Sequence, residues 1–198
     1  MLTLGLDWSM TCPALAVYSG DKENFGFDKC FLYYLSERKP IQWQNITGRK
    51  AVDSTNNEER WNAIAEWMAE RVNYHRVDNE PIKAYCEDYS FGSKGRSFHI
   101  AENMAITKHF LWKMGAKVVP VSPSVIKKFG SGKGNALKEH MFAAFLQETG
   151  HNLMSIFQPK ATNVGSPVGD IVDAYYICKF GIMVGGEGNL EPRKKAAK

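Results

Sequence analysis

The 198-residue sequence lacks paired cysteines and long apolar runs. Its four cysteines are far apart and none belongs to a C-x-x-C pair, so we interpret them as reduced core residues rather than zinc ligands or disulfides. No run of about 18 apolar residues occurs, and the first residues do not follow the basic-then-apolar pattern of an export signal. These absences predict a cytoplasmic protein without a membrane segment.

Acidic residues are missing from the middle of the chain. Residues 103–138 contain seven lysines and no Asp or Glu, and residues 103–198 carry 13 basic against 6 acidic side chains. Residues 1–102 have the opposite balance, with 12 basic and 15 acidic side chains. Such an asymmetry indicates a polyanionic partner, although a solvated basic face explains it equally well.

The length and the composition, with 44% hydrophobic and 23% charged residues, predict one globular domain. We place this domain at residues 1–186 and expect the basic tail, residues 187–198, to be disordered. Strand patterns at the N-terminus, at 12–19 and at 25–35 predict an antiparallel meander. Residues 36–56 are polar and are expected to be irregular.

After residue 56 the pattern alternates between helix and strand. The expected elements are a helix within 56–77, a strand at 82–88, a helix at 97–114, a strand at 116–122, a short helical turn from Ser122, a glycine loop at 130–135, a helix at 135–147 and a last helix with Ser166 as N-cap. This order predicts an α/β fold, a mixed five-stranded sheet with helices on both faces.

Acidic side chains follow the ends of two predicted strands and recur on the last helix. Asp7 and Glu87 lie at the carboxyl ends of their strands, where ligands gather in open sheets. Asp170 and Asp173 lie one turn apart on a helix that is otherwise apolar. If the four carboxylates converge, divalent cations such as Mg²⁺ would relieve their repulsion and support phosphodiester cleavage. Alternatively, the two helical acids face water and favour the helix dipole.

The glycine-rich segment "GSGKGN" at residues 130–135 does not match a nucleotide-binding loop. In the G-x-x-x-x-G-K-[ST] pattern, Lys127 would occupy the first glycine position and Gly134 the final Ser/Thr position. We therefore expect no nucleotide cofactor. The glycines either let the backbone approach a phosphate or simply join two helices.

Four segments, in order and with similar spacing, resemble the motifs of RuvC-like Holliday-junction resolvases in the RNase H-like superfamily. They are "GLDWS", "AYCEDYSF", "VIKKFGSGKGNALKEHM" and "GDIVDAYYICKFG", and the resemblance spans about residues 1–185. It implies an RNase H-like fold and a homodimeric, metal-dependent endonuclease that nicks two strands of a four-way DNA junction symmetrically. A phage or viral member, acting in the host cytoplasm, would fit the compact chain.

The resemblance also assigns residues. The family's metal-binding acids, with two Mg²⁺ or Mn²⁺ ions, match Asp7, Glu87, Asp170 and Asp173. Its active-site lysine matches Lys138 and a phosphate-contacting lysine matches Lys127, while further DNA contacts are expected from Lys128, Lys133, Tyr89 and Phe91. The two aromatics flank Ser90, the position of a family aromatic near the junction centre. The helix at 97–114 is the implied dimer surface, and residues 36–56 have no clear counterpart in the bacterial enzymes.

Three other functions remain to be weighed. An RNA–DNA hybrid hydrolase of the same superfamily would use the same metal chemistry and is the nearest rival. An actin-like or sugar-kinase-type ATPase would need a duplicated second half, for which this chain is too short. A non-catalytic junction-binding protein would be expected to lack an acid, and all four are present.

Overall fold

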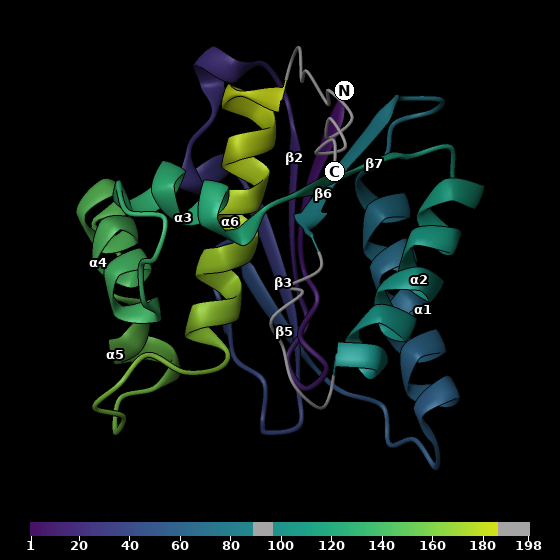
Figure 1. Ribbon diagram of the computed structural model, residues 1–198, viewed down its shortest axis with the longest axis horizontal. Coiled ribbons are helices and arrows are strands. Elements are labelled where there is room, and N and C mark those ends of the chain that lie inside the picture. The colour runs from purple at the N-terminus through teal and green to yellow at the C-terminus, as the bar shows by residue number, and fades with distance from the viewer. Residues whose placement is uncertain (89–96, 186–198) are drawn as a thin grey trace, which may run out of the picture.

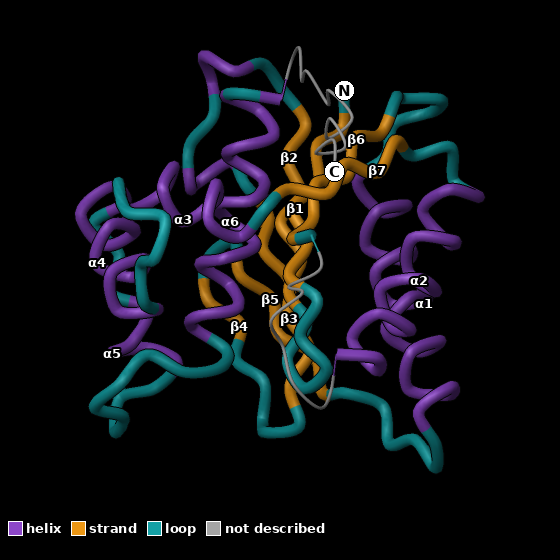
Figure 2. Tube along the Cα trace, in the orientation of Figure 1, coloured by secondary structure: helices purple, strands orange, loops and turns teal. Residues whose placement is uncertain are grey.

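A seven-stranded mixed sheet lies between two layers of helices in the computed structural model, which describes residues 1–88 and 97–185 (Figures 1 and 2). The strands follow the order β4-β5-β3-β2-β1-β6-β7 across the sheet. Their bounds are Leu2–Asp7 for β1, Ala14–Ser19 for β2, Phe31–Ser36 for β3, Gln42–Trp43 for β4, Ile46–Lys50 for β5, Ile82–Glu87 for β6 and Lys117–Val121 for β7. The mixed sheet expected from the sequence is confirmed.

Among the described residues, two helices cover one face of the sheet and four cover the other (Figure 1). The first layer consists of α1 (Asn57–His75) and α2 (Ser97–Lys113), and the second of α3 (Pro123–Ser131), α4 (Lys138–Thr149), α5 (Leu153–Phe157) and α6 (Val168–Met183). Each layer encloses its own buried apolar cluster against the sheet. The apolar face predicted for the helix within 56–77 is buried in α1, at Trp61, Ile64, Ala65, Met68 and Val72.

The alternation along β1 directs its side chains to the two layers. Leu2, Leu4 and Leu6 are fully buried in the cluster beneath α1 and α2. On the opposite face, a Cβ built on Gly5 would lie 2.3 Å from Ala174 O and 2.3 Å from Cys178 N, so α6 rests directly on the strand backbone. Because Cys178 also donates its thiol to Thr3 O, at 3.6 Å, the first turn of α6 lies toward the carboxyl end of β1.

The pairing of the strands determines which strands end at the same edge of the sheet. β1 is parallel to β6, with Leu6 opposite Cys86, so Asp7 and Glu87 end their strands at the same edge. β2 is antiparallel to both β1 and β3, which makes β3 run in the same direction as β1. The carboxyl ends of β1, β3 and β6 therefore lie at one edge of the sheet, which we call the carboxyl edge.

The expectation of five strands was wrong because the segment 36–56 is not irregular. It contains β4 and β5, and β5 pairs in parallel with β3 from Leu32 and Ile46 to Ser36 and Lys50. The third strand is also shorter than expected, since it begins at Phe31 and a 3-10 turn occupies Phe27–Lys29. The amide of Asn45 bonds to Phe27 O and Cys30 O, and this long-range contact ties the added strands to the sheet.

The helices on the second face also differ in detail from the expectation. The turn expected after Ser122 is a nine-residue helix, α3, which continues into the predicted glycine loop. A short helix, α5, lies between α4 and α6, in a segment for which the sequence analysis predicted no helix or strand. Ser166 is not the N-cap of the last helix, because α6 begins at Val168 and Pro167 occupies the cap position without a side-chain cap.

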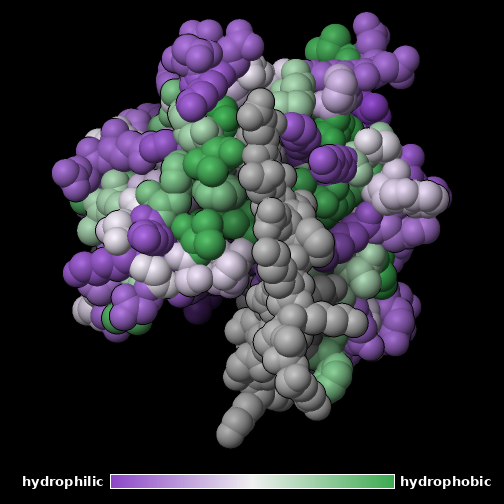
Figure 3. Space-filling view, turned by 45° about the horizontal axis from the view of Figure 1, so that its top comes forward, coloured by the Kyte–Doolittle hydropathy of each residue, from purple (hydrophilic) through white to green (hydrophobic). Residues whose placement is uncertain are grey.

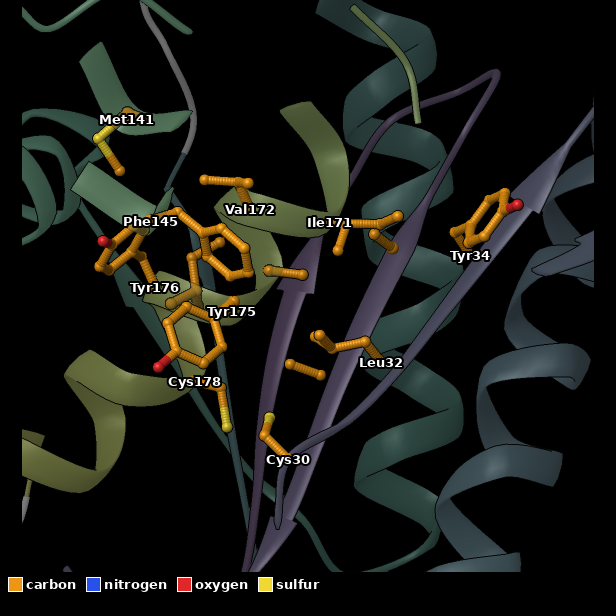
Figure 4. Packing of buried hydrophobic residues seen from close by; sticks show 14 of the residues in the cluster. Cys30, Leu32, Tyr34, Met141, Phe145, Ile171, Val172, Tyr175, Tyr176 and Cys178 are labelled. Atoms are coloured by element: carbon orange, nitrogen blue, oxygen red, sulfur yellow. The ribbon is translucent and has the colours of Figure 1, made fainter. Parts of the chain in front are cut away.

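α4 packs against α6 through apolar side chains, which Figure 4 shows, and is also joined to it by polar contacts. Met141 and Phe145 of α4 belong to the same buried cluster as Tyr175 of α6. The Tyr175 hydroxyl donates to Glu148 Oε1 at 2.7 Å, and Lys179 Nζ lies 2.6 Å from the same oxygen. These contacts hold the start of α4, where Lys138 lies, in a defined place beside α6.

All four cysteines are buried free thiols, as expected. On the face seen in Figure 3, hydrophobic residues gather toward the middle and hydrophilic residues lie around them. None of the helices among the described residues has the length and apolar character needed to cross a membrane. Tyr89, Phe91 and the tail, residues 187–198, lie outside the described residues.

Candidate active site

Four acidic side chains from three distant segments lie at the carboxyl edge and form what we call the acid cluster: Asp7, Glu87, Asp170 and Asp173. Asp7 and Glu87 are the last residues of β1 and β6. Asp170 and Asp173 come from the first two turns of α6, which approaches β1 closely at Gly5. The backbone contact at Gly5 therefore determines where the two helical acids lie relative to the strand acids.

Asp170 is the most buried member of the acid cluster. It is 4% exposed, and its Oδ2 atom is buried without a hydrogen-bond partner. A buried carboxylate oxygen with no donor is unfavourable unless a cation or another donor approaches it. This unsatisfied oxygen is the feature of the site that a hard cation would relieve.

Burial and the charges of neighbouring acids raise the pKa values of Asp7 and Asp173. Burial raises the pKa of Asp7 well above its usual range, and the negative charges of the other three acids raise it further. Burial and then the charge of Glu87 raise the pKa of Asp173 to about 7, despite the nearby lysines. Burial also raises the pKa of Glu87, while Lys127 and Lys138 act to lower it. The four carboxyl groups thus lie within the range of direct charge–charge interaction.

Lys138 is the first residue of α4, and its ammonium group faces the acid cluster. Its Nζ lies 3.7 Å from Asp170 Oδ1. Burial acts to lower the pKa of Lys138, but the charges of the acids outweigh this effect and raise the pKa. The side chain reaches the acids across Gly169, where a Cβ would lie 3.0 Å from Lys138 Cδ. Glycine at this position leaves room for the lysine.

The other predicted lysines separate into two groups. Lys127 lies close enough to the cluster to lower the pKa of Glu87 and oppose the rise at Asp173. Its neighbour Lys128 lines a shallow hollow with Val125 and Phe180, on another side of α3. Lys133 is exposed in the loop after α3. The structure brings Lys127 and Lys138, but not Lys128, to the acid cluster.

Cys12 is a site residue that the sequence interpretation missed. It lies in the turn between β1 and β2 and is 3% exposed. Burial, followed by the charges of Asp170 and Asp7, raises the pKa of its thiol above its usual range. The only signal in the sequence is its position five residues after Asp7, which an apolar run conceals. Cys12 therefore lies against the acid cluster rather than simply in the core.

The acid cluster is not a ready-made metal site. Among residues 1–88 and 97–185, no three carboxylate, thiol or imidazole side chains group closely enough to hold a metal ion. The chemistry of the donor set still suits a hard cation, because it consists of carboxylate oxygens, one of them buried and without a partner. Mutual repulsion of the acids opposes closer approach unless a cation lies between them.

Comparison with known proteins identifies the fold. No protein-family model matches the chain, and no curated protein matches it in sequence. Among solved structures, Thermus thermophilus RuvC matches with a TM-score of 0.58 and 17% identity over 93% of this chain and 97% of that one. T. thermophilus RuvC in complex with a Holliday junction substrate matches with a TM-score of 0.57 and 18% identity over 90% and 91% of the two chains.

The chain has the RuvC fold. The Fowlpox virus resolvase, in complex with Holliday junction DNA, is a more distant match, with a TM-score of 0.49 and 14% identity over 94% of this chain and 100% of that one. The two T. thermophilus RuvC structures confirm the mixed α/β fold that the resemblance implied. Within this RuvC fold, the acid cluster lies where β1, β6 and the first turns of α6 meet.

Proposed function

We propose that the chain is a metal-dependent, structure-selective endonuclease that resolves four-way DNA junctions by paired, symmetric nicks. The observation that carries this proposal is the acid cluster, whose members come from three distant segments and in which burial and neighbouring negative charges raise the pKa values of Asp7 and Asp173. Acids held together at such an electrostatic cost are typical of functional sites. The RuvC fold supports junction DNA as the substrate, since one structure with that fold contains a Holliday junction.

The acid cluster would hold two Mg²⁺ ions, with Mn²⁺ as a substitute. Asp7, Glu87, Asp170 and Asp173 supply the hard oxygen donors that these ions prefer. When bound, such ions activate a water molecule and stabilise the leaving oxygen in phosphodiester cleavage. The buried, unpartnered Asp170 Oδ2 is the strongest support for this assignment.

The two nearby lysines have separate roles in the proposal. Lys138 remains positively charged beside the acids because they raise its pKa, so it neutralises charge that develops on the scissile phosphate. Lys127 binds a phosphate of the cleaved strand next to Glu87. Lys128 and Lys133, outside the cluster, would contact the backbone of the junction arms without reading its sequence.

Paired nicks require two acid clusters, which a homodimer provides. A two-fold symmetric dimer presents the same site to both strands of a symmetric junction. The surface we propose is the outer side of α2, where Phe98 and Trp112 are 79% and 69% exposed. Large aromatic side chains exposed to this extent are enriched at protein interfaces.

A substrate panel tests the proposed function. With Mg²⁺, the protein should cut a synthetic four-way junction into nicked duplexes, whereas linear duplex and RNA–DNA hybrid should be poor substrates. Asp7→Asn should reduce cleavage by at least about a thousandfold and leave junction binding nearly unchanged, because it removes a metal ligand but no phosphate contact. Cleavage is measured on labelled strands and binding by gel shift with a chelator present.

The matched control is Asp53→Asn, which removes an exposed acid outside the acid cluster. This variant should cut the junction at the parent rate. Equal cutting of the hybrid and the junction would replace the proposal by an RNA–DNA hybrid hydrolase. Junction binding without any cutting by the parent protein would indicate a non-catalytic junction-binding protein.

A further inference from the structure

A second group of charged side chains lies at the carboxyl edge, apart from the acid cluster. It surrounds a pocket of about 390 Å³ that we call the basic pocket. Arg38 and Lys39 enter the pocket from the segment after β3, and Lys160 enters it from the segment after α5. Tyr34 and Phe157 contribute apolar surface to it, and none of the described residues that line it is acidic.

The topology places the basic pocket next to the acid cluster. β3 runs in the same direction as β1, so the segment that follows β3 emerges at the same edge as Asp7. The pocket also includes Ser166 and Pro167, which immediately precede α6. Asp170 lies in the first turn of that helix. The start of α6 therefore connects the pocket directly to the acid cluster.

The three cations of the basic pocket have no acidic partners. Within residues 1–88 and 97–185, none of Arg38, Lys39 and Lys160 makes an ion pair, whereas other cationic side chains of the molecule do. Examples of such pairs are Arg49 with Glu70 at 2.9 Å, Arg60 with Glu37 at 2.7 Å and Lys179 with Glu148 at 2.6 Å. Like charges gathered around one hollow without a counter-charge create a positive potential that attracts anions.

The walls of the basic pocket are held in place without a ligand. The Gln158 amide donates to Ser166 O at 3.0 Å and accepts from Gly165 N at 3.2 Å, which closes the segment before α6 into a fixed loop. Across the pocket, the Tyr34 hydroxyl accepts from Ile41 N at 2.8 Å and donates to Ile41 O at 3.1 Å. A preformed pocket loses little entropy when it binds an anion.

We propose that the basic pocket binds backbone phosphates of a DNA junction arm, next to the strand that enters the acid cluster. This inference rests on the proposed function, and it adds a second phosphate site that none of the four sequence motifs contains. Arg38, Lys39 and Lys160 are all exposed, so an extended polyanion can reach each of them. Cationic side chains around an open hollow suit consecutive phosphates, which position DNA without reading its sequence.

The first test measures the salt dependence of junction binding without divalent metal. The variant Lys39→Ala/Lys160→Ala should reduce the slope of log Kd against log salt by about two, since each lost phosphate contact removes about one unit. The matched control, Lys22→Ala/Lys29→Ala, removes two exposed lysines between β2 and β3, at the opposite edge of the sheet, and should keep the parent slope. Equal slopes for parent and pocket variant would overturn the inference.

A second test locates the DNA directly. Because all four native cysteines are buried, Lys39→Cys introduces an exposed thiol to which a photoactivatable cross-linker can be attached. The labelled variant should cross-link to one junction arm, whereas Lys29→Cys, labelled in the same way, should not. Equal cross-linking yields from the two positions would contradict a phosphate site at the pocket.

A third experiment, with inorganic phosphate, distinguishes binding of DNA at the pocket from binding of a small anion. If phosphate raises the melting temperature of the parent but not of the pocket variant, and both bind DNA with the same slope, the pocket binds a free anion and the inference is wrong. These binding measurements can be made even if the protein does not cut DNA. A protein that fails to cut but shows the expected change in slope contradicts the nuclease proposal alone, while normal cutting with an unchanged slope contradicts only the pocket.

Discussion

The carboxyl group of Asp173 lies in surroundings that disfavour its ionised form. Burial and then the charge of Glu87 raise its pKa to about 7, whereas an aspartate in an unfolded chain has a pKa of about 3.9. Between these values the folded protein binds more protons than the unfolded chain. The contribution of Asp173 to the free energy of unfolding therefore falls as the pH rises through this window.

The first prediction follows from the direction in which the contribution of Asp173 to stability changes with pH. In the presence of a chelator, Asp173→Asn should gain stability relative to the parent as the pH rises from about 4 to about 7, because the amide does not ionise. Each unit of pKa shift corresponds to about 1.4 kcal/mol, so the difference is measurable by urea unfolding at a series of pH values. Asp53→Asn, at an exposed site, should follow the parent, and an Asp173→Asn curve parallel to the parent curve would contradict the assignment.

At the residue scale, the sequence was informative where a residue type is unusual in its setting. Carboxylates at strand ends and on an apolar helix stand out, and Asp7, Glu87, Asp170 and Asp173 do lie together. Cys12 did not stand out, because a cysteine in an apolar run is usually a core residue. Only the fold, which lays the turn after β1 against the first turn of α6, brings its thiol to Asp170.

At the scale of elements, the contact between α6 and β1 controls the site. The helix backbone lies so close to the strand at Gly5 that a Cβ would be 2.3 Å from Ala174 O and Cys178 N. Neither atom belongs to a flexible side chain, so the whole helix would have to move. Because Asp170 and Asp173 are carried by that helix, stability and the geometry of the acid cluster depend on the same residue.

The second prediction is that Gly5→Ala destabilises the protein and also impairs cleavage. Overpacking of a close backbone contact typically costs about 1–3 kcal/mol or more, which urea unfolding measures. Junction cleavage by the protein that remains folded should fall by more than tenfold, because the helical acids shift relative to Asp7. Gly26→Ala is the control, since its Cβ would meet only the exposed carboxylate of Asp28, at 2.7 Å. Normal cleavage by folded Gly5→Ala would show that α6 can shift without disturbing the site.

Elements with strong periodicity were predicted well, and short elements were not. The helix now seen as α1 has an apolar face that repeats over about three turns, from Trp61 to Val72, and its position agrees with the prediction within a few residues. β4 has two residues and β5 has five, without an alternating pattern. Their pairing with β3 depends on long-range contacts such as Leu32 N with Asn45 O, at 2.9 Å, which no local pattern reveals. Five strands were therefore expected where seven are present.

At the scale of the whole molecule, the sheet order assembles the site from parts of the chain that are far apart. Parallel pairing of β1 with β6 could be anticipated from the strand–helix–strand order, and it brings Asp7 beside Glu87. The basic pocket could not be anticipated, because Arg38 and Lys160 approach each other only when α5 and the added strands pack against β3. The carboxyl edge thus combines an acidic centre with basic surroundings, an arrangement that agrees with the proposed cleavage of a polyanion.

The last prediction concerns the assembly. The outer side of α2 exposes Phe98, His109 and Trp112, with the His109 and Trp112 rings stacked at 5.9 Å between their centroids. If this side forms the dimer interface, Trp112→Glu should convert the dimer to monomers, because a buried unpaired carboxylate is strongly unfavourable there. Sedimentation analysis of the parent and the variant at the same concentration measures this change.

The consequence for cleavage makes the prediction specific. A monomer carries one acid cluster, so the variant should release singly nicked junctions while the parent releases paired nicks, even though both cut the same strand positions. Tyr74→Glu on the neighbouring helix α1 is the matched control, since Tyr74 is 74% exposed and lies outside α2. A parent that sediments as a monomer, or a Trp112→Glu variant that stays dimeric and still pairs its nicks, excludes α2 as the interface and requires symmetric cleavage to arise from another surface.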